Sequence, residues 1–458
     1  MKQKLNILFP LRKEDILIYK ERNQTGCEVN KMAAQPFSVI ETKKKAAALA
    51  VLCFLIYASS YIGRLNYSAA LTELIADQIL TKAQGGMIST IYFAVYGAGQ
   101  LVNGLLADRH DPMKQVLIGV TGSAVLNYLF LKCNTYGAML IVWGLNGYVQ
   151  ALIWAPMFLL VSQHMSREFR PQALMLINMA PAAGTILGYL FSSLVLWQFP
   201  WQSLFTGAAL VLAGGSVLWI LGCKHAFRGA RLAEEQTPEW KPSGNPVRLE
   251  REKLSRVVML SGVGMLILPA MIQGMLKDGV TSWVPTYLTE RFSLPPQIAV
   301  AVTILLPVVN ILGAAGVYLF LRKIPNEATA MGVLFLCAGG GLLALQLVGQ
   351  ISALLSAGLL ALVTAGMMSV NVIICSEVPL RFSVFGKSAS VSGFMNACGY
   401  IGAAASMYGI AVLSERYGWT VTQWVWIGSC LLAAVLSLSV GKRWMEFRRK
   451  NWRCEHLR

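Results

Sequence analysis

Charged residues are scarce in this sequence, since only 13% of the 458 residues are Asp, Glu, Lys or Arg. Soluble globular proteins usually carry about 25% charged residues, so the composition excludes a soluble enzyme. Hydrophobic residues make up 55% of the chain, which excludes a disordered or collagen-like protein and indicates a membrane protein. Acidic residues and histidines are few, at 22 and four, so proton relays have few candidate groups.

Cysteines are odd in number and show no metal-ligand spacing. We therefore expect no disulfide bonds, no metal site and no cofactor. The nine cysteines stand at positions 27, 53, 133, 223, 337, 375, 398, 430 and 454.

The segment 1–31 is charged throughout and lacks the apolar core of a signal peptide. It is either a cytoplasmic tail or the product of a start assigned too early, with Met32 as the true start.

Apolar runs of about 20 residues predict membrane-spanning helices, and the chain contains twelve such runs. The fold class predicted from them is an all-α membrane protein with twelve transmembrane helices. The predicted spans are 46–70, 85–107, 115–132, 137–162, 172–197, 202–222, 256–284, 297–320, 328–347, 351–375, 388–413 and 421–441.

The net charge of +17 could indicate a nucleic-acid partner, but the basic residues are distributed by topology. Of the 39 Lys and Arg residues, 33 fall on the side of the N-terminus when sides alternate at every span, and four fall on the other. The positive-inside rule then places both termini in the cytoplasm. We expect a multi-pass protein of the inner cell membrane that contacts the lipid bilayer. We expect no nucleic-acid partner.

One long polar segment divides the spans into six and six, as in transporters built from two parallel repeats. The predicted organisation is a pseudo-twofold 6+6 arrangement. Its parts are an N-terminal tail (1–45), a first six-helix bundle (46–222), a cytoplasmic linker (223–255), a second six-helix bundle (256–441) and a C-terminal tail (442–458).

Arg64 and Lys277 are the only basic residues inside predicted spans, at near-equivalent positions of the two halves. An intramembrane cation costs at least about 2.5 kcal/mol, so it normally faces a cavity and serves function. Asp278 is the one acidic residue well inside a span, and one carboxylate cannot neutralise two cations. We predict that the pair binds an anionic substrate. The alternatives are a structural ion-pair network and, for Asp278, proton transfer.

Two polar and aromatic stripes accompany these charges. Tyr57 and Tyr61 share a helical face with Arg64 at spacings of four and three residues, which favours a binding role over packing. The second stripe is Tyr92, Tyr96 and Gln100, in which Tyr92 favours packing. Phenol and amide groups can hydrogen-bond phosphate or carboxylate oxygens.

Several motifs resemble the organophosphate:phosphate antiporter family of the major facilitator superfamily, over residues 46 to 441. The Asp108–Arg109 turn is shared across the superfamily, whereas the Tyr/Tyr/Arg helix together with Trp-x-Pro-x-Tyr is more specific. The matching runs are Tyr57-x-x-x-Tyr61-x-x-Arg64-x-Asn66, Tyr96-Gly97 through Gly104 to Asp108-Arg109 and Pro112, Asn146-Gly147-x-x-Gln150-x-x-x-Trp154-x-Pro156, Lys277-x-Gly279-x-x-x-Trp283-x-Pro285-x-Tyr287, and Gly393 through Gly399-Tyr400-x-Gly402.

The resemblance implies a rocker-switch exchanger in which two basic residues clamp a phosphoryl group. By this resemblance the substrate-binding residues are Arg64, Lys277, Tyr57, Tyr61, Tyr96, Gln100, Trp154 and Asp278, and the conformational residues are Gly104, Asp108 and Arg109. Three positions depart from glycerol-3-phosphate or hexose-6-phosphate transporters: Lys277 replaces Arg, Gln100 replaces a cavity Lys, and Pro181 replaces a cavity His. The identity of the substrate is therefore open.

The predicted function is secondary active exchange of a small organophosphate, such as a sugar phosphate or glycerol phosphate, for inorganic phosphate by a monomer. One alternative is a proton-coupled symporter for an organic carboxylate, with Asp278 carrying the proton. Another is a transporter-like sensor of sugar phosphates that signals through a partner membrane protein.

Overall fold

The computed structural model describes residues 38–40, 42–106, 111–166, 168–228, 231–232, 261–382 and 388–456. These residues are almost entirely helical, and nine of their helical segments are long and apolar enough to cross a membrane. The two strands, β1 (Ser38–Val39) and β2 (Arg231–Leu232), pair antiparallel. The prediction of an all-α membrane protein is confirmed.

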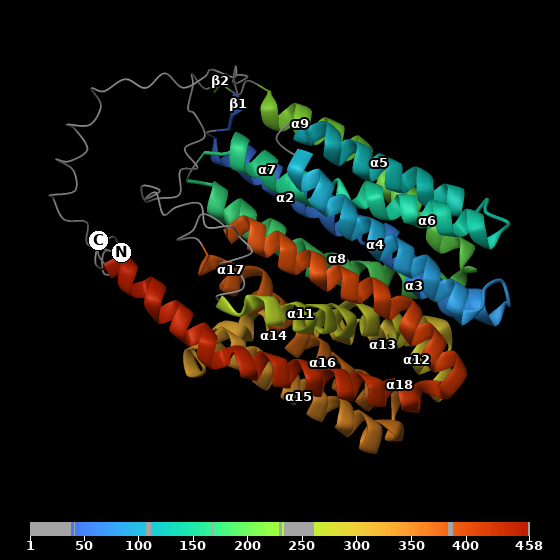
Figure 1. Cartoon of the computed structure of the whole chain (residues 1–458). Coiled ribbons are helices and arrows are strands. Elements are labelled where there is room, and N and C mark those ends of the chain that lie inside the picture. The colour runs from blue at the N-terminus through green and yellow to red at the C-terminus, as the bar shows by residue number, and fades with distance from the viewer. Residues whose placement is uncertain are drawn as a thin grey trace, which may run out of the picture.

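The helices of the first half lie together in the upper part of Figure 1. They are α2 (Lys43–Ser60), α3 (Ile62–Ala76), α4 (Lys82–Leu106), α5 (Pro112–Phe130), α6 (Tyr136–Ala151), α7 (Trp154–His164), α8 (Arg170–Gln198) and α9 (Gln202–Phe227).

The helices of the second half lie beside them in the lower part. They are the 3₁₀ turn η2 (Val263–Leu266), α11 (Ile267–Gly274), the π-helical turn η3 (Met275–Gly279), α12 (Val280–Phe292), α13 (Pro296–Thr303), α14 (Leu305–Lys323), α15 (Glu327–Val348), the 3₁₀ turn η4 (Gly349–Ile351), α16 (Ala353–Val372), the π-helical turn η5 (Ile373–Glu377), α17 (Val378–Leu380) and α18 (Ser388–His456).

Each predicted span falls almost entirely on helix wherever the structure describes it, although the ends differ. The helix α9 continues past residue 222 to Phe227, and α18 continues past residue 441 to His456. The long α18 is two helices that join at Gly418, whose φ of 78° and ψ of 173° reverse the chain direction. The count of twelve crossings and the domain boundaries stay predictions.

Short polar side chains begin several helices. Asp111, Thr135, Asn326 and Ser352 each accept a backbone N–H in the first turn of the helix that follows. These caps satisfy donors that the helix cannot pair internally, so each helix has a defined start.

The two ends of the helical bundle are named here for orientation. The terminal side is the side where α2 begins and α18 ends, at the left of Figure 1, and the distal side is where α3 ends. The site lies between the halves, on helices that run from one side to the other.

Candidate anion-binding site

The first membrane-spanning helix is interrupted at Tyr61, between α2 and α3 and one turn before Arg64. Backbone carbonyls freed near this break are capped by buried amides: Gln150 donates to Ser60 O at 3.1 Å, and Asn146 donates to Gly63 O at 3.1 Å. Asn127 also donates to Gly63 O, at 3.2 Å. An unsatisfied carbonyl costs several kcal/mol inside a membrane, so these amides stabilise the break and thereby position Arg64.

Arg64 is surrounded by aromatic rings. Its guanidinium carbon lies 4.8 Å from the ring centre of Tyr96 and 5.1 Å from that of Phe93. Tyr61 and Tyr92 complete the cage at 5.4 and 5.7 Å. Among the residues that the structure describes, no carboxylate forms an ion pair with this guanidinium. Cation–π contacts stabilise the charge without neutralising it.

Tyr92 combines the predicted packing role with a place in the cage. Its ring is 2% exposed, packs on Trp143 and donates from its hydroxyl to Gln150 Oε1 at 3.2 Å. Phe93 was not predicted, because a phenylalanine in an apolar run carries no signal of its neighbours.

Tyr57 and Trp154 extend the aromatic surface away from Arg64. The Tyr57 ring lies 5.6 Å from Tyr61 and 4.7 Å from Trp154. The shared face predicted for Tyr57, Tyr61 and Arg64 is therefore present. Tyr57 itself is 5% exposed, so its main contacts are with these rings.

Lys277 and Asp278 form an ion pair on the π-helical turn η3. The Lys277 Nζ lies 3.0 Å from Asp278 Oδ1 and 2.9 Å from Oδ2, and both side chains are 22% exposed. Glycines bring α18 against this segment: a Cβ on Gly274 or Gly402 would lie 1.9 Å from a carbonyl oxygen of the facing helix. Close packing therefore fixes the backbone that carries the pair.

Irregular backbone occurs at equivalent places in the two halves. The α2/α3 break corresponds to η3 in the first helix of the second half. The α6/α7 break before Trp154 corresponds to η5 in the helix that contains Cys375. Such irregularities often mark functional sites, and here they flank Arg64 and Lys277.

Tyr96, Gln100 and Tyr400 connect the two halves between the cations. Gln100 Nε2 donates to the Tyr96 hydroxyl at 2.8 Å, and the Tyr96 and Tyr400 rings lie 5.2 Å apart. Asn396 of α18 also donates to Gln100 Oε1, at 3.3 Å. These contacts join the α4 residues beside Arg64 to the helix that packs against the Lys277–Asp278 turn.

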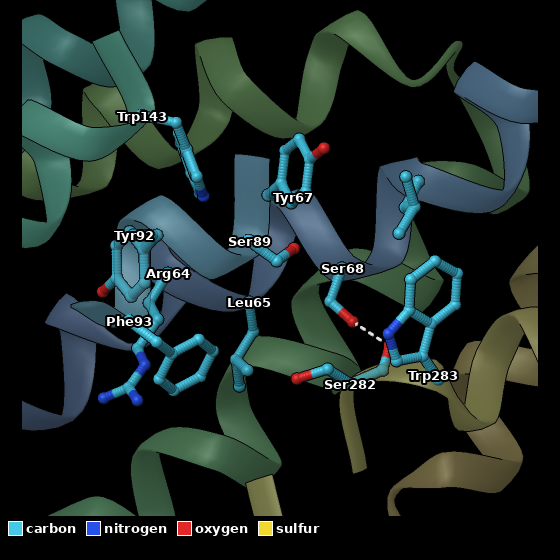
Figure 2. A pocket seen from close by; sticks show the side chains of 11 residues that line it. Arg64, Leu65, Tyr67, Ser68, Ser89, Tyr92, Phe93, Trp143, Ser282 and Trp283 are labelled. Atoms are coloured by element: carbon cyan, nitrogen blue, oxygen red, sulfur yellow. Dashed lines mark hydrogen bonds between the residues drawn. The ribbon is translucent and has the colours of Figure 1, made fainter. Parts of the chain in front are cut away.

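A small pocket lies beside Arg64, towards the distal side. Figure 2 shows Ser68 and Trp283 at its far end, where the Ser68 hydroxyl donates to Ser282 O at 2.5 Å. The other lining residues include Ser89, Tyr92 and Phe93. Serines and aromatic rings make this pocket neutral beyond Arg64.

Contacts between the halves close the distal side. Lys82 and Glu290 form an ion pair of 2.6 Å, and Trp419 Nε1 donates to the same carboxylate at 2.8 Å. The Thr72 and Thr286 hydroxyls lie 3.1 Å apart. Two further bonds cross the same seam, from Tyr189 to Thr281 O and from Ser193 to Gln297 O.

Of the predicted conformational residues, only Gly104 belongs to a described element. Gly104 is in the last turn of α4, and Asp108 and Arg109 fall outside the described residues. The Lys82–Glu290 pair was missed, because two ordinary loop-side charges 208 positions apart carry no pairing signal.

Comparison with known proteins places these features in a wider context. The sequence model of the Major Facilitator Superfamily matches residues 53–407. The glycerol-3-phosphate transporter of Bacillus subtilis is 25% identical over 85% of this chain and 91% of its own length. A probable hexose phosphate transport protein of Chlamydia trachomatis is 31% identical, over only 26% of each chain. The membrane sensor protein UhpC of Salmonella typhimurium is 24% identical over 52% of this chain and 55% of its own length.

Solved structures share the fold at low identity. A bacterial homologue of the lysosomal transporter Spinster aligns with a TM-score of 0.67 at 14% identity, covering 89% of this chain and 98% of its own. The nucleoside transporter NupG aligns with a TM-score of 0.63 at 13% identity, covering 88% of this chain and 98% of its own. These likenesses support the fold. The predicted resemblance to organophosphate:phosphate antiporters agrees with the sequence relatives.

Proposed function

Because the chain belongs to the major facilitator superfamily of transporters, we propose that it exchanges a small organophosphate for inorganic phosphate by alternating access. The names of its relatives from Bacillus subtilis and Chlamydia trachomatis support an organophosphate as the substrate. The chain spans about half the length of the sensor relative and a quarter of the hexose phosphate relative, so the substrate class rests on the site as well.

The charge balance of the site carries the proposal. Asp278 neutralises Lys277, whereas Arg64 is held by aromatic rings and has no carboxylate partner among the described residues. The site therefore has one positive charge available, next to hydroxyl and amide groups. A phosphoryl group, with its negative charge and several acceptor oxygens, matches that arrangement.

Each residue has a distinct role in the proposed binding mode. The planar guanidinium of Arg64 donates two parallel hydrogen bonds to phosphoryl oxygens, and Lys277 adds a point charge from the other half. Tyr61 and Tyr96 donate hydrogen bonds from their hydroxyl groups, and Gln100 donates one from its side-chain amide. Tyr57 and Trp154 support the Tyr61 ring. Since Asp278 competes for Lys277, an arriving anion shares that ammonium with it.

The closed distal side supports alternating access, because it provides one of the two conformations that the mechanism needs. Contacts such as Lys82–Glu290 would hold this conformation, and they separate when the distal side opens. Under the predicted orientation the terminal side is cytoplasmic, so the conformation faces inwards. An anion that bridges the two halves lowers the free-energy barrier to reorientation. The empty carrier does not reorient, so each anion that leaves must be replaced by another, and transport is an exchange.

The wider setting is also part of the proposal. The protein lies in the inner membrane as a monomer with both termini in the cytoplasm, and inorganic phosphate is its counter-substrate. Gly104, Asp108 and Arg109 act in the conformational change.

A sensor of sugar phosphates is the second candidate, and the similarity to UhpC favours it. A sensor needs the same binding site but no turnover. A proton-coupled carboxylate symporter is less consistent with the site, because Asp278, the acidic residue well inside a predicted span, already pairs with Lys277.

Proteoliposomes loaded with phosphate test the proposal. Uptake of labelled glycerol-3-phosphate or a hexose phosphate that needs internal phosphate would support exchange. Binding of these esters without any flux would support a sensor, and uptake that follows a pH gradient without internal phosphate would support symport.

A further inference from the structure

A cluster of neutral polar side chains lies beside Lys277, and of its members only Gln100 has been given a role so far. Asn371 and Cys375 come from α16 and η5, and Asn396 comes from α18. The Cys375 thiol lies 3.8 Å from Asn371 Oδ1 and 3.9 Å from Asn396 Oδ1, and Asn396 Nδ2 donates to Gln100 Oε1 at 3.3 Å. We call Gln100, Asn371, Cys375 and Asn396 the amide cluster.

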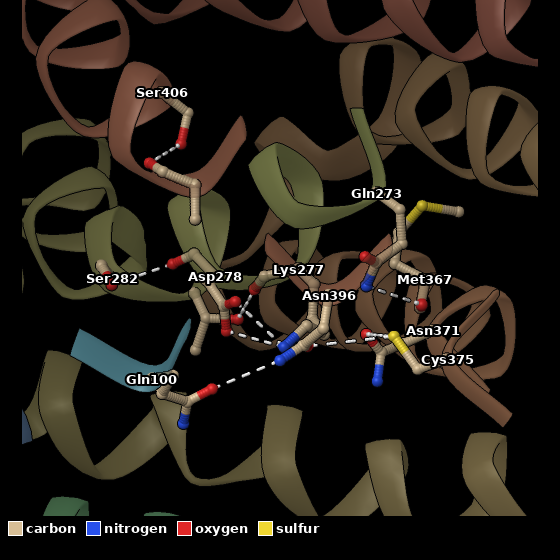
Figure 3. Close-up of polar contacts among 12 residues, drawn as sticks. Gln100, Gln273, Lys277, Asp278, Ser282, Met367, Asn371, Cys375, Asn396 and Ser406 are labelled. Atoms are coloured by element: carbon tan, nitrogen blue, oxygen red, sulfur yellow. Dashed lines mark hydrogen bonds and ion pairs between the residues drawn. The ribbon is translucent and has the colours of Figure 1, made fainter. Parts of the chain in front are cut away.

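The amide cluster lies next to the Lys277–Asp278 pair. Figure 3 shows Asn371, Cys375, Asn396 and Gln100 around the end of the Lys277 side chain. All four cluster residues are partly exposed, in contrast to the fully buried amides that cap the break before Arg64. A ligand held between the two cations therefore reaches the cluster.

The bonds within the cluster are weak and exchangeable. A hydrogen bond of 3.3 Å is long for an amide pair, and thiol contacts of 3.8 and 3.9 Å are weaker still. Replacing such bonds by bonds to a ligand costs little, whereas breaking the 2.7 Å bond between the buried Asn66 and Asn127 would cost more.

The chemistry of the cluster selects hydroxyl groups. A side-chain amide both donates and accepts hydrogen bonds, and so does a hydroxyl group. Each hydroxyl of the ligand can therefore donate to an amide oxygen and accept from an amide nitrogen. A second anionic group would need a second available cation. Figure 3 shows Lys277 as the basic group beside the cluster, and this ammonium already serves Asp278 and the phosphoryl group.

We propose that the amide cluster binds the hydroxylated body of the substrate, so that the transporter selects phosphate monoesters of neutral polyols or sugars over phosphorylated carboxylates. This inference rests on the proposed function and names its substrate class. Arg64 and Lys277 bind the phosphoryl group, while Asn371 and Asn396 form hydrogen bonds with the hydroxyl groups at the other end of the substrate.

Two measurements in phosphate-loaded proteoliposomes test the inference. The first is exchange of labelled phosphate for phosphate, which depends on the phosphoryl site alone. The second is inhibition of that exchange by glycerol-3-phosphate, with 3-phosphoglycerate as the carboxylate analogue. In the wild type we expect glycerol-3-phosphate to inhibit at a concentration at least tenfold lower than 3-phosphoglycerate.

Asn371→Ala and Asn396→Ala should raise the half-inhibitory concentration of glycerol-3-phosphate about tenfold, a larger change than any loss of phosphate exchange. Asn134→Ala is the matched control, because it removes an exposed amide from the turn between α5 and α6. Equal loss of phosphate exchange and glycerol-3-phosphate inhibition would overturn the inference, as would a wild type that does not discriminate.

Alkylation of Cys375 in the detergent-solubilised wild type gives a readout that needs neither a variant nor flux. Glycerol-3-phosphate should slow modification of this thiol at least threefold more than equimolar phosphate, as measured by peptide mass spectrometry. If the wild type shows no phosphate exchange, the proposed function fails, and this protection assay still decides whether the cluster binds the ester. Equal protection by phosphate and glycerol-3-phosphate, or protection by neither, would contradict the inference.

Discussion

Asp278 holds the ammonium of its sequence neighbour Lys277 with both carboxylate oxygens, at 2.9 and 3.0 Å. Neighbouring residues on an α-helix project about 100° apart, but the wider π-helical turn lets these two side chains converge. The pairing leaves Arg64 as the cation of the site without a carboxylate partner among the described residues. The sequence indicated that one carboxylate could not neutralise both cations, but not which cation it would pair with.

Asp278→Asn separates exchange from proton coupling. If the carboxylate only balances Lys277, the variant keeps phosphate-driven exchange and binds a dianion several-fold more tightly, because a repulsive charge has left the site. A pair at about 4 Å is worth from about 1 kcal/mol in water to about 4 kcal/mol at an effective dielectric near 20, so the change is measurable. Half-saturation by phosphate gives the readout. Uptake driven by a pH gradient in the wild type, lost selectively in Asp278→Asn, would instead establish symport.

Lys82→Ala should shift the carrier towards the state with an open distal side. The substitution removes the 2.6 Å ion pair with Glu290 and the contact over the Trp419 ring. A cysteine introduced at Ser68, beneath this seam, should then react with a membrane-impermeant reagent several-fold faster. Lys132→Ala is the control, since Lys132 lies on the distal side, contacts the Tyr128 ring of its own half and has no ion pair among the described residues. Unchanged reactivity in Lys82→Ala would show that the pair does not hold the seam.

Asn146→Ala tests whether the buried amides position Arg64. The substitution leaves Gly63 O with one donor instead of two and removes the partner of the Ser123 hydroxyl. We expect a loss of stability of about 1 to 3 kcal/mol, seen as a lower melting temperature in detergent. Transport should fall as well, since the break before Arg64 loses a cap. A variant with wild-type melting and wild-type transport would rule out this positioning role.

The fold was largely predictable because apolar length is a strong signal, whereas departures from a straight helix were not. The break at Tyr61 interrupts a helix, and the π-turns that begin at Met275 and Ile373 each add about one residue to a turn. No hydropathy pattern reveals either feature. The reversal at Gly418 lies near the predicted gap between spans, but its position depends on a single dihedral angle.

The charged part of the site was found from sequence because charge in a membrane is costly and therefore rare. Asn371 and Asn396 escaped notice, since neutral amides occur in apolar runs without marking what they face. Their proximity to Gln100 depends on how α4 crosses α18, and residues 100 and 396 carry no signal of that crossing.

Orientation rests on the charge asymmetry and can be tested by labelling. A cysteine at Gln198, exposed at the end of α8, should react in intact cells with an impermeant maleimide. A cysteine at Glu235, in the basic linker, should react only after the cells are opened. The positive-inside rule supplies the reason. Reaction at Glu235 in intact cells would reverse the assigned orientation.

The central claim is that Arg64 binds the phosphoryl group of an exchanged anion. The most direct measurement is counterflow of labelled phosphate in proteoliposomes with equal reconstituted amounts of wild type, Arg64→Ala and the distal control Arg416→Ala. Our account predicts exchange that needs phosphate on both sides in the wild type and the control, and a loss of at least a hundredfold in Arg64→Ala. Wild-type counterflow in Arg64→Ala would contradict the account.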